Sequence, residues 1–354
     1  MKKTLLLTHE YYPFKGGIAN YTYYLFKFFN PQDYLIVTDQ QEVKGKNIIN
    51  IKLISQFIKP SYLLSFFKLK RIIKKHNIKQ IFTPNILPLG SLSYFLKVPY
   101  IVSLHGLDIN LALKNRPFLT KKILKKAKKI IVNSKQTAEI VKDFNNKVLL
   151  IYPSIDINSS YDIAKLKNLK KEVKGNNETI LLTVGRLNKR KSQDLVIRAV
   201  KELKNLNLKY YIIGRGEELK NLNNLIKKYN LNNVFILTDI EDNHLIYYYK
   251  LADIFVLPQR NNKEDIEGFG TVFLEAGIYG LPIIAGNKGG PTEILKNNKD
   301  SILIEQDNLK ELKNAIKFLF FNKNKADELG NNIKKRVLEF PSAEKQSNKL
   351  KKIL

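Results

Sequence analysis

The sequence contains no cysteine, and none of its apolar runs is long enough to span a membrane. The first absence excludes a disulfide framework and a thiolate metal site, and it fits a reducing compartment. The second excludes a spanning helix, which needs about 18 uninterrupted apolar residues. The opening MKKTLLLTHE begins like a signal peptide, but His9 and Glu10 end its apolar run too early. We therefore expect a cytoplasmic protein, either soluble or peripheral on the inner face of the plasma membrane.

Acidic residues are scarce beside basic ones: 32 Asp and Glu stand against 61 Lys and Arg, a net charge of +29. A nucleic-acid binder would gather this charge, with aromatic residues, in a recognisable module, and none is visible. We therefore expect no nucleic-acid partner. A membrane-surface protein would place the charge on amphipathic helices. Compositional drift is the third explanation, because Lys, Asn and Ile are abundant throughout the chain.

The length of 354 residues corresponds to about two domains, and an apolar content of 44% supports ordinary globular cores. Short apolar runs alternate with helical patterns, which is typical of βα units around parallel sheets. The expected strands are residues 3–8, 33–38, 79–83, 99–104, 128–134 and 147–152, then 178–185, 208–214, 233–238, 253–258, 281–286 and 301–304. Between 154 and 177 this pattern lapses into polar sequence.

We therefore predict an α/β protein with two Rossmann-like, doubly wound domains, residues 1–160 and 161–340. Ligands of such sheets bind at the carboxyl ends of the strands, so two facing domains would form a central cleft there. Residues 341–354 have weak helical periodicity. They form either a frayed terminal helix or a helix that crosses back to the first domain.

One strand-end loop, GRLNKRKSQD, follows the expected strand at 178–185. Gly185 allows a close backbone approach, and Arg186 and Lys191, with the two basic residues between them, place cations at the carboxyl end of the strand. Cations beside a helix N-terminus suit a diphosphate, because the free N–H groups and the helix dipole already favour an anion. A solvated basic turn is the alternative.

Two other strand-end loops carry candidate residues. Gly16 and Gly17 precede an amphipathic helix, so their backbone amides can approach a phosphate or a sugar. They are not a dinucleotide fingerprint, because no G-x-G-x-x-G follows the first strand. His105 follows the strand at 99–104 and could donate a hydrogen bond to a sugar hydroxyl or a phosphate oxygen. A plain loop and a structural histidine are the alternatives.

The segment EDIEGFGTVFLEA holds two glutamates around a glycine-rich turn. Residues 268–270 suit a loop, and a helix is expected from Thr271 until Gly280 ends it. With a diphosphate over the start of that helix, Glu275 could accept hydrogen bonds from vicinal hydroxyls such as those of a ribose. Glu267 would reach the hydroxyls of whatever the diphosphate carries. Stabilisation of the helix dipole by about 0.3–1 kcal/mol also accounts for Glu267, but not for the glycines.

EGFGTVFLEA resembles the Glu-x7-Glu motif of retaining glycosyltransferases with the GT-B fold, in particular glycosyltransferase family 4. Further segments agree with that family in order along the chain: the glycines at 16–17, HGLD at 105–108, YPSID at 152–156, VGRLNKRKS at 184–192, GRGEE at 214–218, YYYKLADIFVLP at 247–258 and GGPTEI at 289–294. YPSID lacks a glycine that many members carry, and EAGIYG has Gly277 and Ile278 where alanines are common.

The resemblance implies transfer of a hexose from a nucleotide diphosphate sugar to a hydroxyl, with retention at the anomeric carbon. The product would belong to cell-surface polysaccharide, lipopolysaccharide or glycolipid synthesis. No metal and no cofactor beyond the donor co-substrate is implied, and the last helix is expected to cross back to the first domain. LPQRNNKEDIEGFG is similar to members that use GDP-mannose, including phosphatidylinositol mannosyltransferases. A UDP-hexose remains the other donor.

Carried over position by position, the resemblance implies a catalytic set and a donor-binding set. The catalytic set is Glu267, His105, Arg186 and Lys191. The donor-binding set is Gly16, Gly17, Gly185, Arg186, Lys191, Phe269, Gly270, Thr271 and Glu275. Arg186 and Lys191 match the diphosphate-binding pair. Glu275 matches the glutamate that holds the donor ribose, and Glu267 the one that contacts the transferred sugar, which lies close to His105.

Residues 60–79 and 118–130 are amphipathic and strongly basic, and both fall in the first domain, which binds the acceptor in the family. Apolar side chains at 63, 64, 66 and 67 could insert into an anionic leaflet beside the lysines. These segments favour a lipid-linked or membrane-proximal acceptor. Three alternatives stay open: plain surface helices, a soluble sugar or sugar-phosphate synthase of the same fold, and a non-enzymatic polyanion-binding protein that needs neither glutamate.

Overall fold

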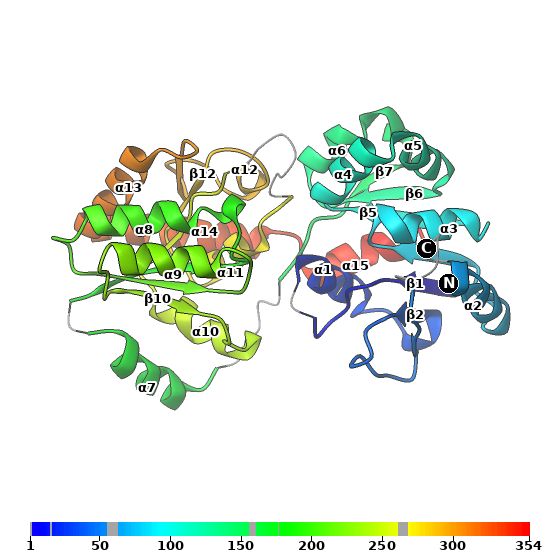
Figure 1. The fold of residues 1–354 in the computed structure, drawn as a ribbon, viewed down its shortest axis with the longest axis horizontal. Coiled ribbons are helices and arrows are strands. Elements are labelled where there is room, and N and C mark those ends of the chain that lie inside the picture. The colour runs from blue at the N-terminus through cyan, green and yellow to red at the C-terminus, as the bar shows by residue number, and fades with distance from the viewer. Residues whose placement is uncertain (1, 15, 55–62, 156–160, 176, 261–267) are drawn as a thin grey trace. The chain divides into compact units, whose positions relative to one another are not determined.

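The computed structural model of the chain describes all residues except 1, 15, 55–62, 156–160, 176 and 261–267 (Figure 1). The chain divides into two compact units. Unit 1 is Met1–Ile155 with Pro341–Leu354, and unit 2 is Asp156–Phe340. The division lies five residues before the expected boundary at 160 and coincides with the one expected at 340.

Unit 1 is built on a seven-stranded parallel sheet with the order β3-β2-β1-β4-β5-β6-β7. The strands are β1 Thr4–Leu7, β2 Tyr34–Thr38, β3 Ile48–Asn50, β4 Gln80–Thr83, β5 Tyr100–Leu104, β6 Lys129–Val132 and β7 Val148–Leu150. The helices are α1 Gly17–Phe26, α2 Leu63–Lys75, α3 Ser91–Phe95, α4 Leu107–Asn115, α5 Pro117–Lys126, α6 Lys135–Ile140 and α15 Ala343–Lys351. Strand order reverses between β1 and β4, which makes this point the topological switch of the sheet.

The last helix, α15, packs on α1 within unit 1. The Ser342 hydroxyl caps it by accepting from the backbone N–H of Lys345 at 3.3 Å. Leu350 is fully buried in the cluster that contains Phe26, and Gln80 Nε2 donates to the carbonyl of Leu354 at 2.7 Å. The expectation that the last helix returns to the first domain is therefore confirmed.

Unit 2 is built on a six-stranded parallel sheet with the order β10-β9-β8-β11-β12-β13. The strands are β8 Thr179–Val184, β9 Leu208–Ile213, β10 Val234–Leu237, β11 Ile254–Leu257, β12 Ile283–Gly286 and β13 Ile302–Ile304. The helices are α7 Ile163–Val173, α8 Gln193–Glu202, α9 Leu219–Lys228, α10 Asp242–Leu251, α11 Thr271–Ile278, α12 Pro291–Ile294, α13 Leu309–Phe321 and α14 Lys323–Glu339. This sheet switches between β8 and β11.

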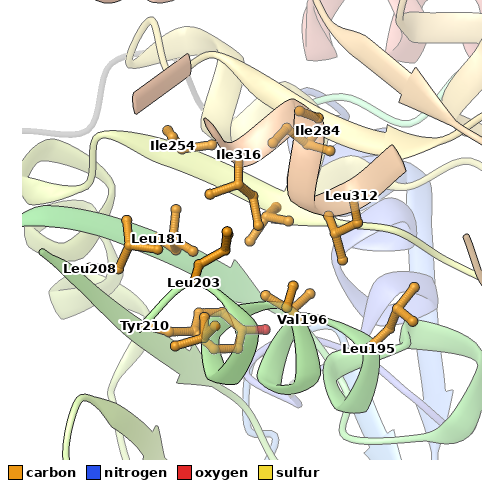
Figure 2. Packing of buried hydrophobic residues seen from close by; sticks show 14 of the residues in the cluster. Leu181, Leu195, Val196, Leu203, Leu208, Tyr210, Ile254, Ile284, Leu312 and Ile316 are labelled. Carbon is orange, nitrogen blue, oxygen red and sulfur yellow. The ribbon is translucent and has the colours of Figure 1, made fainter. Parts of the chain in front are cut away.

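Side-chain alternation in the central strands of unit 2 separates two packing layers. Ile254 and Val256 of β11 belong to the core cluster under α8 and α13, part of which Figure 2 shows around Tyr210 and Ile316. Phe255, the residue between them, instead packs edge-on against Phe273 of α11, with ring centroids 5.9 Å apart. Both faces of β11 are therefore covered, as its uninterrupted apolar sequence requires.

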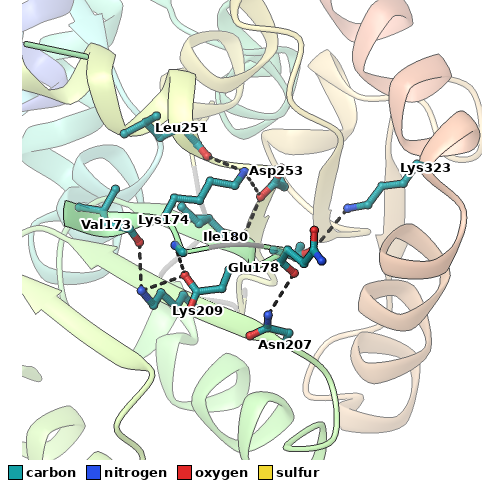
Figure 3. A network of polar contacts seen from close by, with 12 residues as sticks. Val173, Lys174, Glu178, Ile180, Asn207, Lys209, Leu251, Asp253 and Lys323 are labelled. Atoms are coloured by element: carbon teal, nitrogen blue, oxygen red, sulfur yellow. Dashed lines mark hydrogen bonds and ion pairs between the residues drawn. The ribbon is translucent and has the colours of Figure 1, made fainter. Parts of the chain in front are cut away.

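The amino ends of the unit 2 strands carry a network of charges that pair with one another (Figure 3). Asp253, just before β11, accepts from Lys174 Nζ at 2.7 Å and from the backbone N–H of Ile180 at 2.8 Å. Lys209 Nζ lies 2.9 Å from Glu178 Oε2. Asp253 belongs to the YYYKLADIFVLP segment, and its place at the amino edge gives it a structural role, away from the carboxyl edge where ligands bind.

Candidate functional site

The loops that follow β8 and β11 meet at the switch point of unit 2, because these two strands are neighbours in the sheet. The backbone N–H of Arg260 donates to the carbonyl of Arg190 at 2.8 Å, so the two loops are joined directly. Arg186 and Lys191, which were predicted from the sequence to bind a diphosphate, lie on the first of these loops, and the glycine turn at 268–270 follows the second.

The loop after β8 turns at Gly185, whose φ of 149° is unfavourable for residues with a side chain. A Cβ atom at Gly185 would lie 3.9 Å from Lys191 Nζ, so the lysine ammonium group reaches back to the start of the loop. Lys191 is only 7% exposed, and its backbone N–H donates to Asn188 Oδ1 at 3.2 Å. Arg186 is exposed. One cation is thus held in the loop while the other projects from it.

A second loop, GRGEE, braces the first through backbone contacts. The N–H of Gly185 donates to the carbonyl of Ile213 at 2.9 Å, and that of Leu187 to the carbonyl of Arg215 at 2.8 Å. A Cβ atom at Gly214 would lie 1.9 Å from the oxygen of Gly185, and one at Gly216 2.1 Å from that of Leu187. These glycines are therefore required for close backbone approach, which fixes the shape of the cationic loop.

Arg260 is a residue that sequence reasoning missed. Its guanidinium forms a bidentate ion pair with Asp194 of α8, at 2.6 and 2.9 Å, and a further ion pair with Asp307. Hydrogen bonds to these carboxylates, that to Asp194 first, raise its pKa further above the ordinary value. It also donates to the carbonyl of Lys189 at 3.2 Å. Arg260 therefore holds the backbone of the cationic loop on the side that faces α8.

A cavity of about 440 Å³ lies on the same side of the loop and is lined by residues of α8, α9 and the two loops. Arg260 and Asp194 both line it, and they are paired with each other. Neither Lys191 nor Glu275 lines it. The cavity therefore does not include these two candidate residues.

The glycine-rich turn before α11 forms as expected. Gly270 has a φ of 87° and immediately precedes Thr271, the first residue of α11, and Gly280, with a φ of 73°, follows the end of the helix. Phe269 is buried, and a Cβ atom at Gly290 would lie 2.5 Å from its Cα. The GGPTEI segment therefore packs directly against this turn. Glu267 lies outside the described residues.

Glu275 lies in the second turn of α11 and is half-buried. Its Oε2 accepts a hydrogen bond of 2.8 Å from the hydroxyl of Tyr249, on α10. Sequence reasoning named Glu275 but missed Tyr249. The two are 26 residues apart, and Tyr249 was included only as part of the YYYKLADIFVLP segment of the resemblance.

In unit 1, Gly16 and Gly17 lie after β1, at the switch point of that sheet. Gly16 is the N-cap of α1 and Gly17 its first residue. A Cβ atom at Gly17 would have no described atom within 4 Å, whereas one at Gly16 would lie 3.1 Å from Glu10 and Phe14. Gly17 therefore faces open space at the start of a ten-residue helix, where an anion is favoured.

His105 follows β5, and its ring lies edge-on to that of Tyr21, 5.0 Å away. Burial lowers its pKa to about 4, opposed by a hydrogen bond to the carbonyl of Pro84. The ring is therefore neutral at pH 7, with Nδ1 donating to Pro84, because Nε2 is buried without a hydrogen-bond partner. In this tautomer Nε2 is an acceptor, so it suits a hydroxyl donor better than a phosphate oxygen.

A second histidine, His9, also lies at this edge and was not singled out from the sequence. It follows β1, and its Nδ1 lies 2.9 Å from Oδ2 of Asp39, which follows the adjacent strand β2. His9 Nε2 is buried without a partner. Within the described part of the chain, no group of three or more His, Asp and Glu side chains is placed to hold a metal ion.

Each unit thus presents polar loops at the switch point of a doubly wound parallel sheet. The pairing of two such domains, with the last helix returning to the first, defines the GT-B class of glycosyltransferases. Two family models match the chain: Glycosyltransferase Family 4 over residues 15–159, and Glycosyl transferases group 1 over residues 164–336. The chain belongs to this family of glycosyltransferase enzymes.

Several known proteins match this chain over nearly its whole length. An uncharacterised glycosyltransferase of Methanocaldococcus jannaschii is 27% identical, and the match covers 95% of this chain and 93% of the relative. A GDP-mannose-dependent α-(1-6)-phosphatidylinositol monomannoside mannosyltransferase of Mycobacterium tuberculosis is 22% identical, covering 93% and 92%. The crystal structure of HepE from Anabaena, in complex with UDP and glucose, is 18% identical and covers 99% of both chains with a TM-score of 0.83.

Proposed function

We propose that this enzyme transfers a hexose from a nucleotide diphosphate sugar to a hydroxyl of a glycan or lipid-linked acceptor, with retention of anomeric configuration. The observation that carries the proposal is the braced cationic loop from Gly185 to Lys191, which follows β8 at the switch point of unit 2. A loop held by backbone contacts fixes the backbone positions from which its cations extend, which favours binding of a diphosphate.

The donor site would use each residue for a distinct part of the nucleotide sugar. Departure of a nucleoside diphosphate leaves negative charge, so Arg186 and Lys191 would act where that charge develops. Glu275 would accept hydrogen bonds from the ribose hydroxyls. Related proteins take different nucleotides: HepE was crystallised with UDP, and the mycobacterial relative is GDP-mannose-dependent. Both nucleotide series therefore belong in the test.

Thermal unfolding with a panel of UDP- and GDP-sugars tests the donor proposal. A ligand at one hundred times its Kd stabilises the folded state by about 2.7 kcal/mol, which is readily seen as a rise in Tm. We expect one nucleotide series to shift the wild type, and Glu275→Ala to lose the shift. Glu328→Ala on α14, a surface carboxylate, is the matched control. A shift with polyanions but with no nucleotide would contradict the proposal.

Retention would follow from front-face attack, with the leaving phosphate taking the proton of the acceptor hydroxyl. Glycosidases achieve retention through a carboxylate nucleophile instead. By the family pattern Glu267 orients the transferred sugar, so Glu267→Gln should slow the reaction without changing the product anomer. Nuclear magnetic resonance of the product gives the anomer, and mass spectrometry detects adducts. A trapped glycosyl-enzyme or an inverted product would overturn this mechanism.

A lipid-linked acceptor is supported by the surface of unit 1. Phe118 on α5 is 83% exposed, and Leu64 and Phe67 on α2 are 53% and 55% exposed. Exposed lysines surround them on both helices. Apolar side chains beside cations suit an anionic bilayer surface, to which each Lys or Arg contributes about 1 kcal/mol.

The segments expected at the membrane are only partly available for it. Phe66 packs against the core of unit 1, so the expectation that it inserts into a leaflet is not supported. Residues 60–62 and the side chain at 63 lie outside the described set. None of the helices described is both long and apolar enough to cross a membrane.

Sedimentation with liposomes tests the membrane proposal. We expect binding to vesicles with anionic lipid, weakened in Phe118→Ser and unchanged in Phe321→Ser, a matched exposed phenylalanine on α13 of unit 2. Equal sedimentation with neutral and anionic vesicles would favour plain surface helices of a lysine-rich protein.

A further inference from the structure

The buried side chain of Tyr249 links α10 to the candidate donor carboxylate. Tyr249 is 3% exposed, and its hydroxyl donates to Glu275 Oε2 at 2.8 Å. Hydrogen bonds to a charged acceptor are about twice as strong as those between neutral groups. Since Glu275 is half-buried rather than fully solvated, this bond contributes to where its carboxylate group points.

The tyrosine ring is itself held between two other rings. It stacks on Tyr279 with centroids 5.6 Å apart and planes at 18°, and it lies 6.1 Å from Phe255 of β11. Burial, and then the charge of Glu275, raise the pKa of Tyr249 well above its usual value of 10.0. The hydroxyl therefore keeps its proton across the physiological range and remains a donor. Both the position and the protonation state of this donor are fixed.

A carboxylate that binds two vicinal hydroxyls must present its oxygens in a defined plane, because each oxygen accepts along particular lone-pair directions. We propose that Tyr249 is a positioning residue that orients Glu275 to accept from the ribose hydroxyls of the donor nucleotide. The inference rests on the proposed function. Tyr249 acts through Glu275 and does not touch the nucleotide, so its effect should be confined to ribose recognition.

The alternative is that Tyr249 only packs α10 onto the sheet. Tyr249→Phe separates the two, because it removes one oxygen and keeps the ring that stacks on Tyr279 and contacts Phe255. Tyr248→Phe is the matched control, since Tyr248 is the adjacent residue of α10 and its ring faces Tyr211, 6.0 Å away. The Tm without ligand should differ little among the wild type and both variants.

Calorimetric titration with UDP and GDP and with their 2′-deoxy analogues provides the readout. The wild type should prefer the ribonucleotide. In Tyr249→Phe, affinity for the ribonucleotide should fall roughly tenfold, while affinity for the 2′-deoxy analogue changes much less. The preference for ribose should therefore shrink. In steady-state assays the same variant should raise the donor KM more than it lowers kcat.

A double-variant cycle with Glu275→Ala decides whether the effect passes through the carboxylate. With Glu275 removed, Tyr249→Phe should have no further effect on nucleotide affinity. An equal loss in the presence and absence of Glu275, or a full preference for ribose retained in Tyr249→Phe, would overturn the positioning role while leaving the donor site intact. If the wild type bound none of these nucleotides, the proposed function itself would fail, and this inference with it.

Discussion

The carboxyl edges of the two sheets are built in different ways. In unit 2 the loop after β8 is held by backbone hydrogen bonds to the GRG segment, whose glycines leave no room for a Cβ atom. In unit 1 the corresponding edge depends on side chains: His9 pairs with Asp39, and the backbone N–H of His105 donates to Asp108 Oδ1 at 2.7 Å. Backbone bracing tolerates little variation, whereas side-chain contacts can change with the residues.

The same edge of unit 1 contains buried polar atoms that make no hydrogen bond in the described structure. Buried nitrogens of His9, Gln40 and His105 have no hydrogen-bond partner. Buried polar atoms without a partner are rare and costly, and unit 2 has one at its own carboxyl edge, Asn287 Oδ1 after β12.

The largest expected effect comes from breaking the backbone brace. Gly214→Ala places a methyl group 1.9 Å from a carbonyl oxygen and forces alanine to a φ of 155°, so the two loops must separate. We expect unit 2 to lose about 4 kcal/mol or more of unfolding free energy, together with nucleotide binding. Denaturant unfolding and a nucleotide titration measure the two effects. Wild-type stability in this variant would show that the brace does not determine the loop.

A smaller effect is expected from the neutral histidine of unit 1. His105 has a pKa of about 4 when folded and about 6.5 when unfolded, so in this window the unfolded chain binds a proton that the folded protein does not. Its contribution to stability is therefore lost as the pH falls from 6.5 towards 4. Asp108 works in the opposite direction, because burial raises its pKa to about 6 and the folded protein gains a proton first.

Because the two effects oppose each other, a variant is needed to isolate the contribution of His105 to the pH dependence of stability. Between pH 7 and pH 4, His105→Asn should lose about 3 kcal/mol less unfolding free energy than the wild type. Urea unfolding at both pH values gives the difference, and His244→Asn, a surface histidine of α10, is the control. Equal losses in wild type and His105→Asn would mean that His105 is not buried as a neutral ring.

Arg260 tests whether the brace also depends on side chains. Arg260→Gln removes the bidentate pair with Asp194 but keeps the backbone bond to Arg190, because that bond uses the main-chain N–H. Removing Arg260 leaves the partly buried carboxylate of Asp194 with the more distant Arg198 as its partner, so we expect a loss of about 2 kcal/mol and a raised donor KM. Arg198→Gln, whose side chain is more exposed and lies 3.4 Å from the same aspartate, should change both less.

The sequence predicted the parallel sheets well because their strands are short, uninterrupted apolar runs between turn residues. All the expected strands form, and β3, Ile48–Asn50, was missed. The start of α11 at Thr271 was also predicted correctly, because glycine residues mark the turn before it.

Side-chain partners far apart in the chain could not be predicted in the same way. Arg260 and Asp194 are 66 residues apart, and His9 and Asp39 are 30 apart. Sequence position indicates that a residue follows a strand, but the pairing depends on strand order and on which rotamer the packing allows. The glycines of GRGEE were recognised only as part of a resemblance. They are required because the backbone of the loop after β8 leaves no room for a Cβ atom, and this approach of two backbones exists only in the folded sheet.

Among these variants, Gly17→Ala is expected to have the smallest effect on stability. Unlike Gly214, Gly17 faces open space at the first position of α1, so Gly17→Ala meets no steric barrier and gains helix propensity. Unfolding free energy should change by less than about 1 kcal/mol, and in the stabilising direction. If the open space receives the donor phosphate, the added methyl group should nevertheless raise the donor KM, which steady-state kinetics measures. An unchanged KM would place the phosphate elsewhere and leave Gly17 with only a conformational role, so that all anion contacts at the donor would come from unit 2.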